Sequence, residues 1–362
     1  MINRRMFSKA LAVTAVGMVL GAPHTAFADD SETAAEIAFT PEIARALGEN
    51  FAKTMASRTE MSVYGVRPFF DPQGLPLGYV VQFCCEGAPH GYVVFEPQDE
   101  LVSEYSLAEG VVGPGFVFGD QGRSVSNDII IRMNPLLFAL VDGRNGEGHD
   151  DLGRPVSIDG GPLSRATLNQ MMIRYDQLFV QYTVISDNTV EQFSAFDQEY
   201  LQKLDSSGRY ACSVASGFAV CDNYGALNGS NMANDFRTLW SLIGPHKTSS
   251  GWSADLKQTA TGVKTFCQRR GKTVLTEVMA SKPSMSKIQK HIDAGNLLTL
   301  GLHTSSEDHG VTVEGYAFVT KLGTRASGGN PMLIIYDGWH SYPRCIRYDA
   351  AFTSVQGAFY VK

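Results

Sequence analysis

Three side chains in the C-terminal part of the sequence have the chemistry needed for acyl transfer: Cys212, His309 and Asp337. A thiol becomes a nucleophile when a neighbouring imidazole accepts its proton. A carboxylate bound to the other imidazole nitrogen fixes the tautomer of that base. In this order the three residues predict a nucleophile, a general base and a base-orienting group.

Cys212 is expected in the first turn of a helix. Small and apolar residues follow it as far as Cys221, and the turn 206–208 precedes it. The dipole at a helix N-terminus favours the thiolate. A lone cysteine in such a place is more often a buried core residue, so its partners decide the interpretation.

His309 begins a strand-like segment, 309–320, where it can face a cleft and stay partly solvated. Asp337 ends an apolar strand, where an ionised side chain needs a partner; an Asp-Gly turn is the alternative role. Trp339 is expected to cover the hydrogen bond between them and exclude water. Six other histidines are expected to be solvated or structural: His90, His149, His246, His291, His303 and His340.

The first 28 residues are expected to form a cleavable export signal. Arg4 and Arg5 precede an apolar run, 10–20, that is too short to span a bilayer, and the segment ends in a cleavage pattern at Ala28. The paired arginines resemble a twin-arginine signal, with an ordinary secretory signal as the alternative. Cleavage near Ala28 predicts a secreted or cell-surface protein without stable membrane insertion.

The net charge and the cysteine content limit the kinds of partner and cofactor that we expect for the chain. Loss of Arg4, Arg5 and Lys9 with the signal takes the formal net charge from −7 to −10, which argues against nucleic acid or an anionic membrane as the main partner. No two of the six cysteines have Cys-x-x-Cys spacing, so we expect no metal and no cofactor. Cys221 and Cys267 are expected to be reduced core residues, with a single disulfide between them as the alternative.

Length and a hydrophobic content of 44% predict two folded units. Residues 29–140 are expected to form a smaller α+β unit, with a helix over 41–57 beside antiparallel strands. The segment 141–165 is expected to be an exposed linker, because it is rich in Gly and Asp. A calcium-binding loop is the alternative, but the positions of the carboxylates and glycines miss the required pattern.

Residues 166–362 are expected to form a second α+β unit, with helices first and an antiparallel sheet afterwards. A helical period runs over 163–184, and further helices are expected from Cys212, Ser253 and Ser284. After residue 295 the period changes to two, which predicts strands over 297–303, 309–320, 332–337, 345–348 and 357–361. The nucleophile would lie on the helical half and the base on the sheet.

These segments resemble the bacterial papain-like cysteine peptidases, in particular the double-glycine-leader peptidase-like and streptopain-like groups. The resemblance rests on residues 212–215, 288–302, 309–316 and 337–339 and covers about 208–362. It implies a papain-like fold, a protein or peptide substrate and a thioester intermediate. It also implies that Cys212 is the nucleophile, His309 the general base and then acid, and Asp337 the orienting residue.

The N-terminal unit is loosely similar to the inhibitory propeptide of the streptopain-like enzymes, at residues 91–95 and 105–110. This similarity implies intramolecular inhibition by the unit, as in a zymogen. A permanent adhesion or substrate-docking domain is the alternative.

One position departs from the family pattern. The relatives place a glutamine six residues before the cysteine as an oxyanion donor, whereas this chain has Ser206 there and Gln202 as the nearest glutamine. Ser206 or Ser207, with the main-chain N–H of Cys212, are the expected substitutes. We therefore expect an exported cysteine peptidase; a peptidoglycan amidase or endopeptidase, or a catalytically impaired papain-like binding module, are the alternatives.

Overall fold

The computed structural model describes most of the 362-residue chain. The described residues are 36–55, 60–97, 102–116, 128–158, 171–174, 182–191, 193–249, 251–303, 308–321, 330–348 and 354–361, so the expected export signal lies outside them. They contain six helices and nineteen strands, and all strand pairings but one are antiparallel, so the fold class is α+β. None of the described helices is both long and apolar enough to cross a bilayer.

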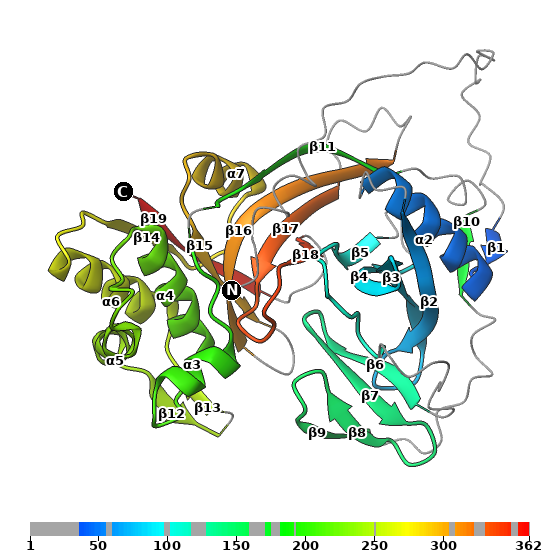
Figure 1. The fold of residues 1–362 in the computed structure, drawn as a ribbon, viewed down its shortest axis with the longest axis horizontal. Coiled ribbons are helices and arrows are strands. Elements are labelled where there is room, and N and C mark those ends of the chain that lie inside the picture. The colour runs from blue at the N-terminus through cyan, green and yellow to red at the C-terminus, as the bar shows by residue number, and fades with distance from the viewer. Residues whose placement is uncertain are drawn as a thin grey trace.

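A helix and four strands form the first part of the fold, close to the expected bounds. Helix α2 (Pro41–Met55) starts with a proline, whose missing N–H costs nothing in the first turn. Its buried face, with Leu47 and Phe51, packs on a sheet (Figure 1). The strands of that sheet are β2 (Met61–Phe70), β3 (Pro76–Cys85), β4 (Ala88–Phe95) and β5 (Val102–Ser106).

Strands also occupy much of the segment 141–165, where we expected an exposed linker. The antiparallel meander consists of β6 (Asp128–Asn134), β7 (Leu137–Asp142), β8 (Glu147–Asp150) and β9 (Pro155–Ser157). The residues that suggested a linker form its turns, since the Asp142 carboxylate accepts the N–H of Arg144 and Gly146 has φ of 73°. The linker prediction is therefore wrong up to residue 158, and 159–165 lie outside the described residues.

β-Structure replaces the helix expected over residues 163–184. β1 (Glu36–Ala38) pairs with β10 (Met172–Arg174), and β11 (Tyr182–Thr189) pairs with β16 (Asp308–Lys321). Tyrosine, threonine, valine and isoleucine fill the first half of β11, and such side chains favour a strand once a neighbouring edge is available. The helix prediction is wrong for these described parts.

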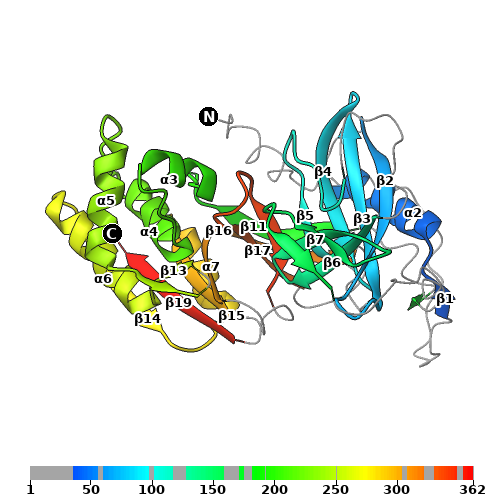
Figure 2. The same cartoon turned by 90° about the horizontal axis from the view of Figure 1, so that it is seen from below.

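Helix α4 (Cys212–Asn223) is the buried centre of the C-terminal part. Its small residues allow close packing, and an added Cβ at Gly217 would lie only 2.9 Å from Val263. Figure 2 shows helices α3 to α6 gathered at the end of the molecule away from α2. The remaining elements are α3 (Gln198–Leu204), α5 (Met232–Ile243), β12 (His246–Thr248), β13 (Gly251–Ser253), α6 (Leu256–Arg269), β14 (Leu275–Met279), α7 (Met285–Asp293), β15 (Leu298–His303), β17 (Asn330–Tyr336), β18 (Arg344–Arg347) and β19 (Ser354–Val361).

Two core cysteines face each other between α4 and α6. The sulfur atoms of Cys221 and Cys267 are 3.9 Å apart, and both residues are buried. In this structure both are free thiols, which is the reduced state expected for them.

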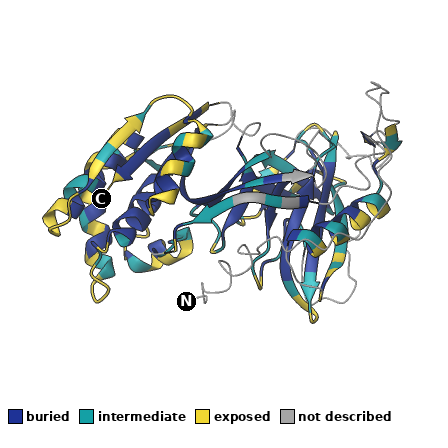
Figure 3. Ribbon diagram, turned by 90° about the horizontal axis from the view of Figure 1, so that it is seen from above, coloured by how far each residue is buried: buried dark blue, intermediate teal, exposed yellow. Residues whose placement is uncertain are grey.

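One sheet runs through both parts of the chain. Its strand order is β14-β19-β15-β16-β17-β18-β5-β4-β3-β2-β6-β7-β8-β9, and β11 pairs with β16 beside this path. The two parts meet where Cys345 of β18 pairs with Tyr105 of β5. β16 also belongs to two cores, because Val311 packs with α4 residues and Val319 with the core of α2. Figure 3 shows buried residues on the strands of both halves.

Candidate active site

Cys212 is the first residue of the buried helix α4. The N-cap residue, Ala211, is extended at φ −143° and ψ 128°, and no side chain caps the helix. The Cys212 sulfur accepts a hydrogen bond from the main-chain N–H of Gly310 at 3.2 Å. The helix dipole and a strand N–H therefore both favour a negative charge on this sulfur.

His309 lies beside Cys212 because β16 begins against the N-terminus of α4. Gly310 permits this approach, since a Cβ there would lie 3.2 Å from the main chain of Ser213. His309 is buried, with 7% of its surface exposed, and its imidazole interacts electrostatically with the Cys212 sulfur. Its Nε2 donates to the main-chain oxygen of Asp337 at 2.5 Å, so Nδ1 is the nitrogen left for Cys212.

Asp337 reaches His309 through its main chain, not through its carboxylate. Oδ1 accepts the main-chain N–H groups of Trp339 and His340, both at 2.9 Å. Oδ2 lies 2.7 Å from His340 Nδ1 and 2.7 Å from Arg344 Nη1. The expected carboxylate–imidazole hydrogen bond is therefore a wrong prediction, because two cations and two N–H groups take up this buried carboxylate.

Trp339 lies flat on the imidazole of His309. The two ring centroids are 3.7 Å apart and the planes differ by 26°. The guanidinium of Arg154 lies 5.6 Å from the centroid of the same indole. The indole shields one face of His309 from water, and an aromatic face is a favourable neighbour for an imidazolium.

Cys212 and His309 each favour the ionised form of the other. Burial by itself would raise the pKa of the Cys212 thiol, but the charge and hydrogen bond of His309 and the N–H groups of Gly310 and Ser213 outweigh it and lower that pKa. Burial would likewise lower the pKa of His309, and the Cys212 thiolate with Asp337 raises it instead. The arrangement favours a thiolate–imidazolium pair.

The groups around the Asp337 carboxylate stabilise one another in their ionised forms. Burial would raise the pKa of Asp337, but His340 and Arg344 hold it well below its usual range. Burial would lower the pKa of His340, but Asp337 and Asp151 raise it to about 10. The carboxylate and both cations are therefore charged at neutral pH.

The two serines proposed as oxyanion donors lie in the turn after α3. The Ser207 hydroxyl donates to the Asp205 carboxylate and accepts from Arg209 Nε at 2.7 Å, and Ser206 is exposed. Neither lines the cavity at the Cys212 sulfur. These contacts give Ser207 a structural part in the turn.

A cavity of about 10 Å³ adjoins Cys212, which is about the space of one water molecule. Its walls come from α4, from β16, from β17 with the turn after it, and from the segment before α3. The lining residues are Phe196, Cys212, Ala215, Ser216, Gly310, Thr312, Tyr336 and Gly338. Cys212 therefore opens into a narrow space in this structure.

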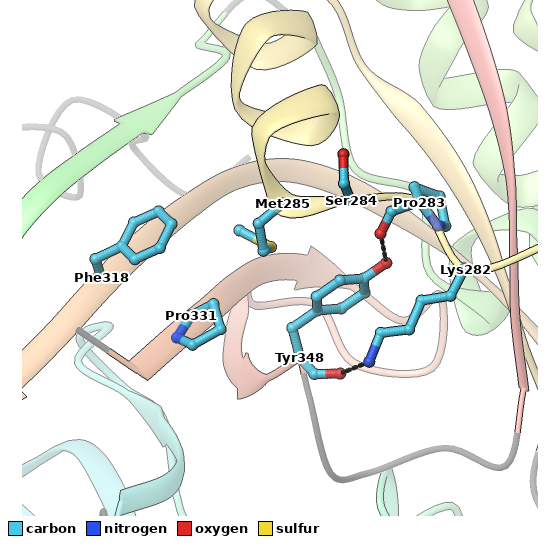
Figure 4. A pocket seen from close by; sticks show the side chains of 7 residues that line it. All are labelled: Lys282, Pro283, Ser284, Met285, Phe318, Pro331 and Tyr348. Carbon is cyan, nitrogen blue, oxygen red and sulfur yellow. Dashed lines mark hydrogen bonds between the residues drawn. The ribbon is translucent and has the colours of Figure 1, made fainter. Parts of the chain in front are cut away.

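A wider pocket, of about 540 Å³, lies further along β16 (Figure 4). Phe318 in its wall is eight residues from Gly310, which is about 26 Å of strand. Its other lining residues are Lys282, Pro283, Ser284, Met285, Pro331 and Tyr348. Lys282 Nζ donates to the main-chain oxygen of Tyr348 at 3.2 Å, and the lining includes no histidine or carboxylate that would serve as a base.

Three residues around Asp337 were not predicted from the sequence as part of this site. His340, expected to be solvated or structural, binds Asp337 and lies 3.5 Å from Asp151. Arg344 and Glu104 form a buried ion pair at 2.9 Å. The short spacing from Asp337 was a signal for His340 and Arg344, but nothing local linked Glu104, 240 residues from Arg344.

Comparison with known proteins places the chain in no family. No family model matches the sequence, and no curated protein sequence matches it. Within the described residues, no group of three or more His, Cys, Asp or Glu side chains is placed to hold a metal ion. The arrangement around Cys212 is therefore the main guide to what the chain does.

Proposed function

We propose that the chain is a cysteine peptidase of the papain-like type, which hydrolyses peptide bonds through Cys212 and His309. One observation carries the proposal: the Cys212 sulfur, at the N-terminus of a buried helix, accepts the main-chain N–H of Gly310, the residue after His309. The thiol and the imidazole lie close enough that each shifts the pKa of the other toward an ion pair. The order of helices and antiparallel strands suits a papain-like fold. The resemblance of the four sequence segments supports the same assignment.

In the first half of the reaction, the Cys212 thiolate attacks the carbonyl carbon of the peptide bond and the π electrons move to oxygen. The main-chain N–H of Cys212 is the hydrogen-bond donor that we expect to stabilise this oxyanion. The His309 imidazolium then protonates the amide nitrogen, and the C–N bond breaks. The amine leaves, and the acyl group stays on Cys212 as a thioester.

In the second half, neutral His309 removes a proton from a water molecule whose oxygen attacks the thioester. The C–S bond breaks, its electron pair returns to the Cys212 sulfur, and the carboxylic acid leaves. The main-chain oxygen of Asp337 holds Nε2–H throughout, so the same ring nitrogen faces the sulfur in both halves.

Turnover is expected to be slower than nucleophile reactivity would suggest. Ser207 is bonded to Asp205 and Arg209, and Ser206, in the glutamine position, is exposed and does not line the cavity at Cys212. Removal of one such donor lowers kcat by about 10²–10³-fold in other hydrolases. Labelling of Cys212 is therefore a more sensitive test than substrate turnover.

Export belongs to the same proposal. After cleavage near Ala28 the chain would act outside the cytosol, on protein or peptide substrates. Its formal net charge of −10 without the signal suits such substrates better than nucleic acid.

Alkylation by iodoacetamide, located by peptide mass spectrometry, tests the nucleophile. We expect Cys212 to react at pH 6 at least about tenfold faster than an ordinary thiol of pKa about 8.5. C212A should lose this label and casein hydrolysis. C84S/C85S is the matched control, because those cysteines are also partly exposed. Equal rates at Cys212 and Cys84 at pH 6 would count against the proposal.

Two further measurements separate the alternatives. Turnover of peptidoglycan without turnover of casein would identify a cell-wall amidase or endopeptidase. An activated ester should give a burst of acyl-enzyme from either hydrolase. No burst and no Cys212 alkylation would point to a papain-like binding module.

A further inference from the structure

The position of the carbonyl that binds His309 depends on what holds the Asp337 carboxylate. That carboxylate is fully buried and fixes the next two main-chain N–H groups, those of Trp339 and His340. The following carbonyl, of Gly338, is also held, by the hydroxyl of Tyr210 at 2.9 Å. The turn is therefore set by groups outside it.

Arg344 binds the Asp337 carboxylate and is itself bound by the N-terminal part of the chain, by which we mean the described residues within 36–158. Its Nη1 donates to Asp337 Oδ2 at 2.7 Å and to the main-chain oxygen of Leu136 at 2.6 Å. Its Nε and Nη2 lie 3.0 and 2.9 Å from Oε1 of Glu104, on β5. Glu104 also accepts from the hydroxyl of Tyr92, on β4, at 2.5 Å. Without Glu104, Arg344 would be a buried cation with one carboxylate partner fewer.

The turn between β8 and β9 adds two contacts from the same part of the chain. Asp151 lies 3.5 Å from Nε2 of His340, and Arg154 lies over Trp339. Other ionisable groups around these charges are Arg132, 3.6 Å from Glu104, and Tyr342, which interacts electrostatically with Arg344. The groups that face His309 itself are Cys212 and Asp337.

These contacts are part of the sheet. β5 pairs with β18, and Ser106 at the end of β5 donates to the main-chain oxygen of Pro343 at 2.9 Å. A removable inhibitory segment leaves a complete fold behind when it is cleaved off. Removal of this part would expose the edge of β18 and leave Arg344 without Glu104.

We infer that Glu104 is a positioning residue for His309, acting through Arg344 and the Asp337 turn, so that the N-terminal part is a permanent component of the catalytic centre. The inference rests on the proposed function, since it concerns the Cys212–His309 pair. On this inference, cleavage of the N-terminal part would not activate the chain.

The test is the pH profile of Cys212 alkylation in full-length E104Q. Misplacement of the Asp337 carbonyl would weaken the ion pair, so the rate at pH 6 should fall about tenfold, the effect of one pKa unit. The rate at pH 9.5, where the thiol ionises without His309, should stay within about twofold of the wild-type rate. A folded E104Q with the wild-type profile would overturn the inference.

D235N is the matched control. Asp235 is as buried as Glu104 and is paired with Arg270, but it lies on α5, where it accepts the main-chain N–H of Asn228 instead of a group of the Asp337 turn. It should lower the melting temperature and leave the alkylation profile unchanged. An equal shift in both variants would mean that the effect is general destabilisation, and this too would overturn the inference.

Y92F keeps the inference testable if E104Q does not fold. It removes one hydrogen bond from Glu104 without burying a new charge. We expect the rate of Cys212 alkylation at pH 6 to fall by about twofold. An unchanged rate would mean that the inference is wrong. Intact mass of the alkylated protein gives an independent check, because the labelled species should contain residues 36–158. If wild-type Cys212 is no more reactive than an ordinary thiol, the proposed function fails; if it is reactive but indifferent to E104Q, only this inference fails.

Discussion

The main-chain oxygen of Asp337 accepts the hydrogen bond from Nε2 of His309, while the carboxylate of the same residue faces Arg344 and His340. In a Ser-His-Asp triad the carboxylate touches the imidazole directly. Here a neutral oxygen sets the tautomer, and the carboxylate adds its charge to that of Cys212 in raising the pKa of His309 against the effect of burial. One residue thus supplies orientation and charge from different atoms.

This division predicts the effect of D337N. Asparagine keeps an oxygen for the N–H groups of the turn but leaves Arg344 and His340 without their carboxylate, so the free energy of unfolding should fall by about 3–5 kcal/mol. Cys212 reactivity should fall by far less than the roughly 10⁴-fold seen when a directly bonded carboxylate is lost. Urea unfolding and alkylation rates at pH 7 measure both. A 10⁴-fold loss at unchanged stability would contradict the geometry.

His340 should make stability depend on pH. Its pKa is about 10 in the folded chain against about 6.5 when unfolded, so its stabilising effect is complete below pH 6.5 and is lost as the pH rises toward 10. The limiting slope is about 1.4 kcal/mol per pH unit. The difference in unfolding free energy between wild type and H340Q should be largest at pH 6 and shrink toward pH 10. A difference that is constant over this range would refute the assignment.

Gly310 should be needed for the contact between β16 and α4. A Cβ there lies 3.2 Å from the N and Cα atoms of Ser213, so G310A should push the strand away from Cys212. We expect a stability loss of about 1–3 kcal/mol and slower alkylation at pH 6. G229A is the control, because nothing lies within 4 Å of its added Cβ. Similar behaviour of the two variants would argue against the close approach.

Trp339 should protect the ionised pair. W339L keeps apolar bulk but loses the aromatic face on His309, so stability should fall by about 0.5–1.5 kcal/mol and alkylation of Cys212 at pH 6 should slow. W339F keeps a ring in place and should lie between wild type and W339L. Thermal melts and alkylation rates check this order. Equal values for the two variants would show that the stack does not act on His309.

The sequence predicted an element correctly where the residues of that element alone show a helical or strand-like hydrophobic period. The helix starting at Cys212 and the strand starting at His309 were both expected, because small helical residues and an alternating strand mark them. The helix expected over 163–184 was wrong for the start of β11, residues 182–184, since the partner of that strand is β16, more than a hundred residues later. Strands β8 and β9 were mistaken for part of a linker, because Gly and Asp residues form the tight turns next to these short strands.

The types of the reacting groups and their elements could therefore be read from single segments of the chain. Which oxygen of Asp337 meets His309 could not, because the backbone of a turn decides whether a side chain or a carbonyl faces a neighbour. The link from Glu104 to Arg344 was equally hidden, since the pairing of β5 with β18 joins residues 240 positions apart. Burial then makes that ion pair matter, because a charge removed from water needs its partner and no local sequence pattern specifies one.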